Sequence, residues 1–505
     1  MFAIEMNDIS KSFSGVPANS HVNLRVKKGE IHCLLGENGA GKTTLMKILF
    51  GLYRADSGTI RINEKEVHVQ NSAMAFNLGM GMVHQHFMLI NNLTVLENII
   101  LGHECGSLRL DMKTAYEQVK ALSDHYHFDL DLNQKVGELS VGMMQRVEIL
   151  KTVYRGADIL ILDEPTAVLT PQEVTSLLDI LNDIRAEGKT IVFITHKLNE
   201  TMDIADAVTV LRGGTTAAAS IPIQETSAEQ LANLMVGRPV SFSLPKQPLN
   251  AGSEVLSVRE ARLLPHVAAK VNFSIRKGEI FGVAGVDGNG QLQLEEGIMG
   301  LLSLPEGDIH LNGQSIRELP VRKRRELGIA HIASDRLKRG VVAPFSLLDN
   351  YLLGNQYRER YCKKGLIDHK AVQESGEKKI KDFQVKAASL AQPLSTLSGG
   401  NQQKVVLGRE VGEDPCLIIA AQPTRGLDIG AIENVHKTLL ELRDQGKAIL
   451  LISGELSEII NLSDRIGVLY KGEFMDIRPA EDYTTEEIGL LMAGRKGGAQ
   501  HGESA

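Results

Sequence analysis

The chain contains one domain-sized pattern twice, and this repeat constrains its fold more than any other feature. Residues 22–44 read VNLRVKKGEIHCLLGENGAGKTT, and residues 271–293 read VNFSIRKGEIFGVAGVDGNGQLQ. LANLMVGR, which ends at Arg238, likewise returns as IGLLMAGR, which ends at Arg495. A repeat of this length in 505 residues predicts two homologous domains, since a single hydrophobic core rarely grows so large.

The spacing between counterparts indicates where these domains begin and end. Lys42 and Gln291 are 249 positions apart, whereas His196 and Gly454 are 258 apart, so the second repeat carries a nine-residue insertion. The stretch PVSFSLPKQPLNAGS between the repeats has three prolines and is typical of a linker. We therefore expect a first domain, a linker, a second domain and a flexible tail at residues 1–237, 238–253, 254–495 and 496–505.

The composition excludes several classes of protein. Hydrophobic residues make up 43% and charged residues 23%, as in soluble globular proteins, and the net charge of −7 argues against a nucleic-acid-binding protein. No run of 18 uncharged apolar residues is present, and the first twenty residues, which include Glu5 and Asp8, do not resemble a secretory signal. The four cysteines lack C-x-x-C spacing, which favours free thiols in a reducing cytosol.

A phosphate-binding loop is predicted in the first repeat. GENGAGKT fits G-x-x-x-x-G-K-[ST] in full and lies between a strand-like run, EIHCLL, and a helix-like run, TTLMKILFG. Backbone N–H groups of such a loop surround phosphate oxygens at a helix N-terminus. Lys42 is expected to reach the β- and γ-phosphates, and the Thr43 hydroxyl to ligate Mg²⁺. The predicted nucleotide cradle consists of Gly36, Glu37, Asn38, Gly39, Ala40, Gly41, Lys42, Thr43 and Thr44.

Two further strand ends in this repeat carry candidate catalytic residues. DILILDEPT is a buried strand that ends in two acids: Asp163 is a candidate Mg²⁺ ligand, and Glu164 a candidate base for the attacking water. His196 ends the apolar strand TIVFITH and can contact the γ-phosphate and the water. A single histidine at a strand end is more commonly structural, so its role depends on its neighbours.

Gln85 and Phe13 are candidates with stronger alternatives. Gln85 lies in GMVHQHF, and its carbonyl oxygen can bind Mg²⁺ or the attacking water. The flanking His84 and His86 lack an acidic or thiol third ligand, so we do not expect a transition-metal site. Phe13, in SKSFSG, can stack on adenine, although an aromatic near a first strand more often belongs to the core.

Two polar segments precede helix-like runs. In LSVGMMQR, Ser140 and Gly142 can offer a hydroxyl and backbone donors to a phosphate, but an ordinary helix N-cap explains them equally well. The sequence Thr170-Pro171-Gln172-Glu173 fits a capping box with proline at the first helical position, which gives Thr170 a structural role.

With these motifs in this order, the chain resembles the ATP-binding cassette (ABC) family over nearly its whole length. The aromatic loop, Walker A, Q-loop, signature, Walker B, D-loop and H-loop occur in sequence and are then repeated. The resemblance implies an α/β fold of two tandem P-loop NTPase domains. Each is expected to have a RecA-like core, an antiparallel β subdomain and an α-helical subdomain. It also implies that the cassettes pair head to tail, so that each ATP lies between the Walker A of one and the signature of the other.

Under this implied pairing, the residues lost from the two cassettes all belong to the same one of the two ATP sites. That cassette has replaced the residues of the Walker motifs, Q-loop and H-loop by Gln291, Leu292, Ser334, Ala421, Gln422 and Gly454, but it keeps the signature LSGGN. The first cassette shows the reverse, because its signature reads LSVGM. One ATP site is therefore expected to be complete, with Ser398, Gly399, Gly400 and Asp428 contributed in trans, and the other to be degenerate in both halves.

Tandem cassettes with one degenerate site resemble the ATPase subunits of bacterial importers for simple sugars and nucleosides. MVHQHFMLINNLTVLENIILG and LSVGMMQRVEI resemble the nucleoside branch, although ASDR at 333–336 departs from its PEDR. The implied cofactors are ATP and Mg²⁺. The implied partners are two polytopic permease subunits and, indirectly, an extracytoplasmic solute-binding protein, with no nucleic acid. The chain would lie on the cytoplasmic face of the membrane, held only by the permeases.

Two segments are candidates for docking the permeases, and rival functions follow from related families. FMLINNLTVLENI and VVAPFSLLDNYLL can bind permease helices or simply fill the helical subdomains. The alternative function is a soluble tandem-cassette ATPase acting on ribosomes, for which a long charged helical linker and two complete sites are expected. A DNA-repair ATPase would require coiled-coil or zinc insertions.

Overall fold

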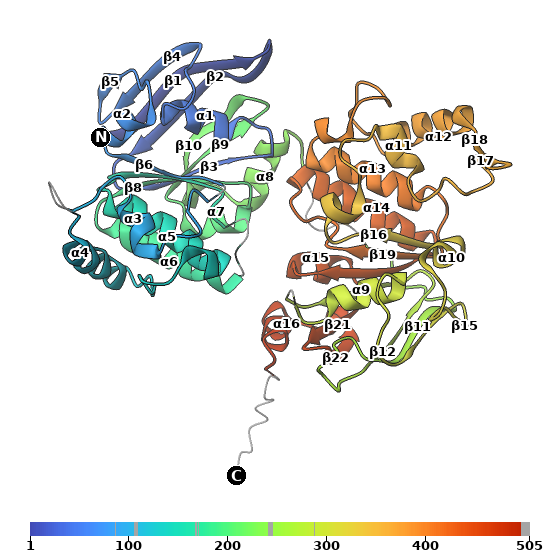
Figure 1. Ribbon diagram of the computed structural model, residues 1–505. Coiled ribbons are helices and arrows are strands. Elements are labelled where there is room, and N and C mark those ends of the chain that lie inside the picture. Colours follow the sequence, from blue (N-terminus) through green and yellow to red (C-terminus); the bar gives the residue numbers. More distant parts are fainter. Residues whose placement is uncertain are drawn as a thin grey trace. The chain divides into compact units, whose positions relative to one another are not determined.

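A computed structural model describes residues 1–85, 87–105, 110–166, 169, 171–240, 246–286 and 288–495, without the side chains of residues 171 and 172. The chain divides into two compact units, Met1–Val240 and Ser241–Ala505 (Figure 1). Residues 86, 167, 168, 170 and 241–245, among others, lie outside the described part, and with them the predicted contribution of Thr170.

The first unit is built around a six-stranded sheet of order β10-β9-β3-β8-β7-β6. Neighbours from β9 to β6 pair in parallel, and β10 is antiparallel at one edge. Parallel strands are covered on both faces, which explains the unbroken apolar runs that the sequence shows at β3 and β8. The strands are β3 (Ile31–Gly36), β6 (Met80–Val83), β7 (Ile159–Asp163), β8 (Thr190–Thr195), β9 (Ala207–Arg212) and β10 (Thr215–Pro222).

A second, antiparallel sheet of order β2-β1-β4-β5 covers helix α1 (Lys42–Leu49). Ile4 and Leu24 of this sheet, Leu45 of α1 and Ile161 of the central sheet belong to one buried cluster. The helix that follows the phosphate-binding loop is therefore packed between two sheets (Figure 1). The strands are β1 (Phe2–Phe13), β2 (Val16–Lys27), β4 (Ser57–Ile62) and β5 (Lys65–Val67).

Helices form the opposite layer of the first unit (Figure 1). Thr94 and Glu97 make a capping box at the start of α3, and the Asn98 side chain binds the carbonyl of Ile90, which holds the preceding loop against this helix. The remaining helices are α2 (Ser72–Asn77), α3 (Val95–Ile100), α4 (Met112–His125), α5 (Val141–Tyr154), α6 (Pro171–Ala186), α7 (Leu198–Ile204) and α8 (Ala228–Val236), with short 3₁₀ turns at Val136–Glu138 and Ile223–Glu225.

The second unit repeats this architecture. Its six-stranded sheet has the order β16-β19-β20-β13-β21-β22, and its antiparallel sheet the order β12-β11-β14-β15. The strands are β11 (Glu254–Ala261), β12 (Val271–Arg276), β13 (Ile280–Ala284), β14 (Asp308–Leu311), β15 (Gln314–Ser315), β16 (Ile329–Ile332), β19 (Leu417–Ala421), β20 (Ala448–Ser453), β21 (Arg465–Tyr470) and β22 (Glu473–Pro479). The predicted combination of a parallel core, an antiparallel sheet and a helical layer is confirmed in each unit.

The helices of the second unit follow the same order, with one addition. A small hairpin of β17 (Cys362–Lys363) and β18 (Leu366–Ile367) lies within the interval where the spacing of the repeats requires an insertion. The helices are α9 (Gln291–Met299), α10 (Val321–Glu326), α11 (Leu347–Leu352), α12 (His369–Asp382), α13 (Gly399–Val411), α14 (Ile429–Asp444), α15 (Leu456–Leu462) and α16 (Thr485–Met492). Shorter helical turns occur at Arg336–Gly340, Leu394–Thr396 and Ala480–Asp482.

Candidate functional site

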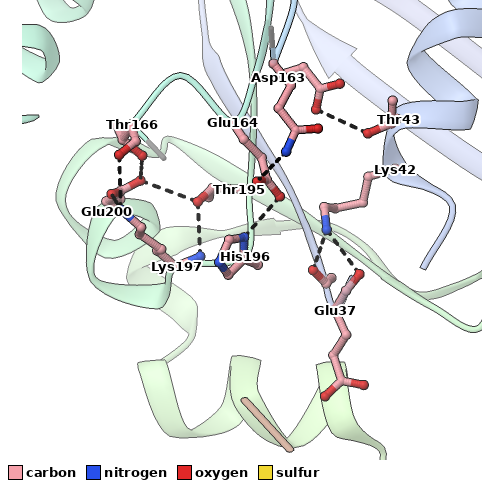
Figure 2. A network of polar contacts seen from close by, with 12 residues as sticks. Glu37, Lys42, Thr43, Asp163, Glu164, Thr166, Thr195, His196, Lys197 and Glu200 are labelled. Atoms are coloured by element: carbon pink, nitrogen blue, oxygen red, sulfur yellow. Dashed lines mark hydrogen bonds and ion pairs between the residues drawn. The ribbon is translucent and has the colours of Figure 1, made fainter. Parts of the chain in front are cut away.

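The predicted phosphate-binding loop joins β3 to α1 and is folded around the Lys42 side chain. The Nζ atom of this buried lysine donates to the carbonyls of Gly36 at 2.6 Å and Glu37 at 3.1 Å (Figure 2). Gly41, the N-cap of α1, has a φ of +95°, and a Cβ there would lie 2.4 Å from Asn19 Nδ2, so the turn requires glycine. The other predicted cradle residues complete the loop and the first turn of α1: Asn38, Gly39, Ala40, Thr43 and Thr44.

Thr43 and Asp163 bring two oxygen ligands together next to this loop. Thr43 Oγ1 donates to Asp163 Oδ1 at 3.3 Å (Figure 2). Burial at the end of β7 raises the pKa of Asp163, and the hydrogen bond from Thr43 opposes that rise. A hydroxyl and a carboxylate beside a phosphate site are the hard oxygen donors that Mg²⁺ prefers. The residues therefore fit the predicted cation.

Glu164 is the centre of a second group of contacts. Its Oε1 accepts a hydrogen bond from His196 Nδ1 at 3.0 Å, and its Oε2 accepts one from Gln85 Nε2 at 3.4 Å. Glu164 has a φ of +49°, a left-handed backbone conformation that is costly for a residue with a side chain, and its N–H is held by the Ile194 carbonyl at 3.0 Å. Gln85 and His196, which follow β6 and β8, thus both contact the Glu164 carboxylate after β7. Figure 2 shows His196 and Glu164 facing each other.

The environment of Glu164 keeps it ionised. Burial acts to raise the pKa of its carboxyl, but the hydrogen bond and charge of His196, with Lys42 and Lys197, outweigh burial and hold the pKa below its usual range. A group that must accept a proton from water has to be deprotonated beforehand. In this structure His196 therefore holds the Glu164 carboxylate and favours its ionised form.

We expect the His196→Ala substitution to move the acidic limb of the hydrolysis pH profile to higher pH. Without the histidine, burial dominates and the pKa of Glu164 rises, so the base is lost earlier as the pH falls. The measurement is kcat for ATP hydrolysis between acidic and neutral pH, with His125→Ala, on the exposed end of α4, as the control. Coincident acidic limbs in the wild type and the His196→Ala variant would contradict this role.

A further polar network behind the site was missed from the sequence. Glu200, buried in α7, accepts hydrogen bonds from Thr166 Oγ1 at 2.6 Å and Thr195 Oγ1 at 3.4 Å, and it pairs with Lys197 at 2.9 Å (Figure 2). These contacts tie the loop after β7 to the loop that carries His196. The only sequence signal is an acid four residues after that histidine, which an ordinary helix start would also explain.

Phe13 and the neighbours of Gln85 lie as follows. Phe13 ends β1 and is 42% exposed, with its ring in edge contact with Tyr53 at 5.2 Å, so it is a surface aromatic and not a core residue. His84 is partly buried in edge contact with Phe50, and burial lowers its pKa, whereas His86 lies outside the described residues. Among the described residues no three His, Cys, Asp or Glu side chains form a metal cluster.

The two signature segments begin equivalent helices. Ser140 caps α5 by accepting from Met143 N, and Ser398 caps α13 by accepting from Asn401 N. A Cβ at Gly142 would lie 2.2 Å from the Glu173 carboxylate, and one at Gly400 would lie 2.9 Å from the Cβ of Ala431. Gly400 is therefore required by helix packing within the second unit, whereas at Gly142 the close atoms belong to the end of a flexible glutamate side chain, which can move aside.

The units differ at the preceding signature position. Val141 is 42% exposed and places a side chain at the start of α5, whereas Gly399, which is partly buried beside the Arg336 guanidinium, has no side chain at the start of α13. Asp428, the fourth residue predicted to act in trans, caps α14 by accepting from Ala431 N at 2.8 Å. The second unit thus lacks the side chain that the first unit carries at this position.

The second unit keeps the backbone conformation of the predicted nucleotide site but lacks the charged and hydroxyl side chains found there in the first unit. Gly290 has a φ of +113°, and the Gln291 amide donates to the Val286 carbonyl at 2.8 Å, which spans the loop as Lys42 does in the first unit. Gln422 has a φ of +45°, and its N–H binds the Ile452 carbonyl at 2.7 Å, as Glu164 does with Ile194. Neither amide can supply a positive charge or a base, and Leu292 has no hydroxyl.

Among the described residues, no helix combines the length and the apolar character needed to cross a bilayer.

Comparison with known proteins identifies the family. Residues 19–167 and 268–425 match the ABC transporter family. The chain is 49% identical to the guanosine import ATP-binding protein NupO of Bacillus subtilis (strain 168), over 98% of both chains. It is 45% identical to the nucleoside import ATP-binding protein NupA of Lactococcus lactis subsp. cremoris (strain MG1363), over 97% of this chain and 98% of that protein. It is 37% identical to the ribose import ATP-binding protein RbsA of Bacillus cereus (strain ATCC 14579), over 97% and 99%. The chain belongs to the ABC transporter family, and it is an ATPase of that family with two tandem cassettes.

Proposed function

We propose that this protein is the ATP-hydrolysing subunit of a bacterial importer for nucleosides or simple sugars, with one catalytic ATP site. The observation that carries the proposal is the complete contact network around Glu164 in the first cassette, beside the matched loss of each group in the second. The nucleoside assignment is supported by the relatives at 49% and 45% identity, which are named for guanosine and nucleoside import.

In the proposed reaction each residue of the first cassette has a defined task. Backbone N–H groups of the loop and the Lys42 ammonium hold the β- and γ-phosphates. Magnesium, when bound, neutralises charge on the phosphate oxygens, and Thr43, Asp163 and the Gln85 carbonyl would hold it. Glu164 takes the proton of the attacking water, and His196 holds the carboxylate in place. Phe13 would stack on adenine at the exposed end of β1.

The second cassette is proposed to complete this site in trans. Ser398, Gly399, Gly400 and Asp428 would face the γ-phosphate, while the degenerate loop at Gln291 serves the fold. This arrangement is supported by the contrast between Gly399, which has no side chain at the start of α13, and the exposed Val141 side chain at the start of α5. The proposed cassette limits are residues 1–237 and 254–495, with a linker at 238–253 and a tail at 496–505.

The proposed partners are two polytopic permeases and, through them, an extracytoplasmic solute-binding protein, with the chain on the cytoplasmic face of the membrane. The docking segments divide into two parts. Met88, Ile90 and Phe345 are exposed apolar residues in the loops, whereas Val95 and Leu347, at the starts of the following helices, are buried. Docking is therefore proposed for the loops only. A soluble ATPase acting on ribosomes is not favoured, because the relatives aligned over the whole chain are import subunits.

The test compares Ser398→Ala with Ser140→Ala in the ATPase activity of the complex reconstituted with its permeases. Both serines are helix N-caps, so both substitutions cost about 1 kcal/mol of capping and control for each other. Loss of one transition-state donor slows turnover by roughly 100-fold. We expect that loss for Ser398→Ala and nearly normal turnover for Ser140→Ala. The opposite result would overturn the proposed pairing.

A further inference from the structure

The second cassette contains a polar cavity far from its nucleotide loop. The cavity has a volume of about 250 Å³ and lies where the chain enters β16 and β19, at the N-terminal ends of these parallel strands. The degenerate nucleotide loop follows the C-terminal end of β13, at the opposite edge of the same sheet. The cavity is lined by Arg325, Glu326, Asn355, Arg358, Glu410, Glu413 and Asp414, together with shorter and apolar residues.

Two donors at this cavity lack acceptors. Asn355 is fully buried, and its Nδ2 has no hydrogen-bond partner among the described residues, although its Oδ1 accepts from Arg358 Nε at 3.0 Å. Arg325 Nε has no acceptor with hydrogen-bonding geometry in the described part of the chain, although the Tyr357 side chain lies close enough to interact with this guanidinium. A buried donor without an acceptor is costly, so the Asn355 N–H group requires an oxygen from elsewhere, which Arg325 Nε can share.

The charges around the cavity leave positive charge in excess. The Nε atom of Arg409 lies 2.7 Å from Oε1 of Glu410 and neutralises this carboxylate. Arg325 also contacts the Glu410 carboxylate, at 3.0 Å, and is therefore a second cation at a single negative charge. Burial acts to raise the pKa of Glu410, but the two arginines lower it to about 2, and the group is ionised.

The other three lining acids are neutralised in the same way. Glu413 pairs with Lys379 at 3.0 Å, which leaves Arg358, at 3.9 Å, as the extra cation. Glu326 pairs with Arg322 and Lys323, and Asp414 pairs with Lys447, so these two acids do not offset the excess. The positive charges of Arg325 and Arg358 are therefore not balanced by the acidic residues that line the cavity.

The first cassette has different residues at the positions that line this cavity. Counting along the repeat puts Phe76 where the second cassette has Arg325, and Thr152 where it has Glu410. The Phe76 ring packs at 5.3 Å against Phe50, with the Arg155 guanidinium 5.7 Å from its centroid. The position of Arg325 is thus taken by an aromatic residue that packs on another aromatic ring in the first cassette, and the charged lining of the cavity belongs to the second cassette.

We infer that this cavity is a binding site for a phosphate-type oxyanion, either free phosphate or the phosphate group of a small phosphomonoester. Such a group carries close to two negative charges at neutral pH, which matches the two surplus arginines. Its oxygens would accept from Asn355 Nδ2 and Arg325 Nε. The volume of about 250 Å³ corresponds to roughly eight water molecules, so it admits the anion and a short organic substituent.

The test is a titration of the full chain with phosphate at constant ionic strength. Binding is measured by calorimetry and by the shift in the midpoint of thermal unfolding. It is done in a Lys42→Ala background, because the intact phosphate-binding loop would also take the anion. Inorganic phosphate and glycerol phosphate are titrated separately, and the tighter one identifies the source. We expect one saturable site at millimolar concentration or below.

Asn355→Asp is the decisive variant. It keeps the size of the side chain and the acceptor for Arg358, but it replaces the free donor with a negative charge, so binding should weaken at least about 10-fold. Arg325→Gln, which retains a neutral donor, should weaken it less and guards against misfolding of the first variant. His103→Asp, at the equivalent turn of the first cassette, should change nothing. Absence of saturable binding, or binding unaffected by Asn355→Asp, would overturn the inference and leave a water-filled cavity.

Discussion

Glu164→Gln is expected to slow ATP hydrolysis by about 1,000-fold and to leave ATP binding nearly unchanged. Glutamine has the size of glutamate and can keep a contact with His196, but it cannot take the proton of the attacking water. The hydrogen bonds from Lys42 to the carbonyls of Gly36 and Glu37 do not involve the altered group. The measurement is kcat for the reconstituted complex, with the Kd for ATP determined separately.

The second cassette provides the control for this substitution. Gln422 occupies the equivalent position with a φ of +45°, against +49° for Glu164, so the fold already accepts glutamine in this left-handed conformation. The reciprocal Gln422→Glu change should add no activity, because Ala421 and Gly454 still replace the metal ligand and the histidine. Turnover by Glu164→Gln within about tenfold of the wild type would exclude Glu164 as the base.

The fold and the position of the site could be predicted because they depend on local patterns. Buried parallel strands appear as unbroken apolar runs, and the loop between β3 and α1 has a glycine spacing set by backbone geometry. Residues that directly follow strands β6, β7 and β8 must meet at one edge of a parallel sheet. The convergence of Gln85, Glu164 and His196 therefore followed from strand order once the family pattern was recognised.

Features that depend on contacts between distant segments could not be predicted. The hydrogen bond between Glu200 and Thr166 joins helix α7 to a loop 34 residues earlier, and nothing in either segment marks the pairing. The sequence predicts Gly142 as a phosphate donor or part of a cap, but it does not reveal that the Glu173 carboxylate lies against this glycine. Gln291 appeared only as a loss, whereas its amide takes over the contact across the loop. In each case the deciding quantity is a distance between side chains, which spacing along the chain does not reveal.

Arg443→Met is expected to destabilise the second cassette by about 3–5 kcal/mol. Arg443 and Asp464 form a bidentate ion pair, in which Nη2 and Nε of the arginine donate to the two carboxylate oxygens at 2.7 and 2.9 Å. The two side chains are 2% and 3% exposed. Asp464 also accepts from the Ile280 N–H at the start of β13. Removing the arginine leaves this carboxylate buried, and among the described residues the remaining salt-bridge partner is Lys246 at 3.7 Å.

The repeat supplies a matched control in the first cassette. Arg185 and Asp206 form the equivalent pair at 2.8 Å, and Asp206 binds the Ile31 N–H in the same way, but the two side chains are 34% and 36% exposed. Water can solvate that carboxylate after Arg185→Met, so the cost should be at most about 1 kcal/mol. Urea unfolding with hydrogen exchange resolved to β13 and β3 measures the two cassettes separately. Equal losses of unfolding free energy for both substitutions would show that burial does not set the contribution of this pair. A loss confined to Arg443→Met would mean that the stability of the second cassette depends on a buried ion pair, whereas that of the first does not.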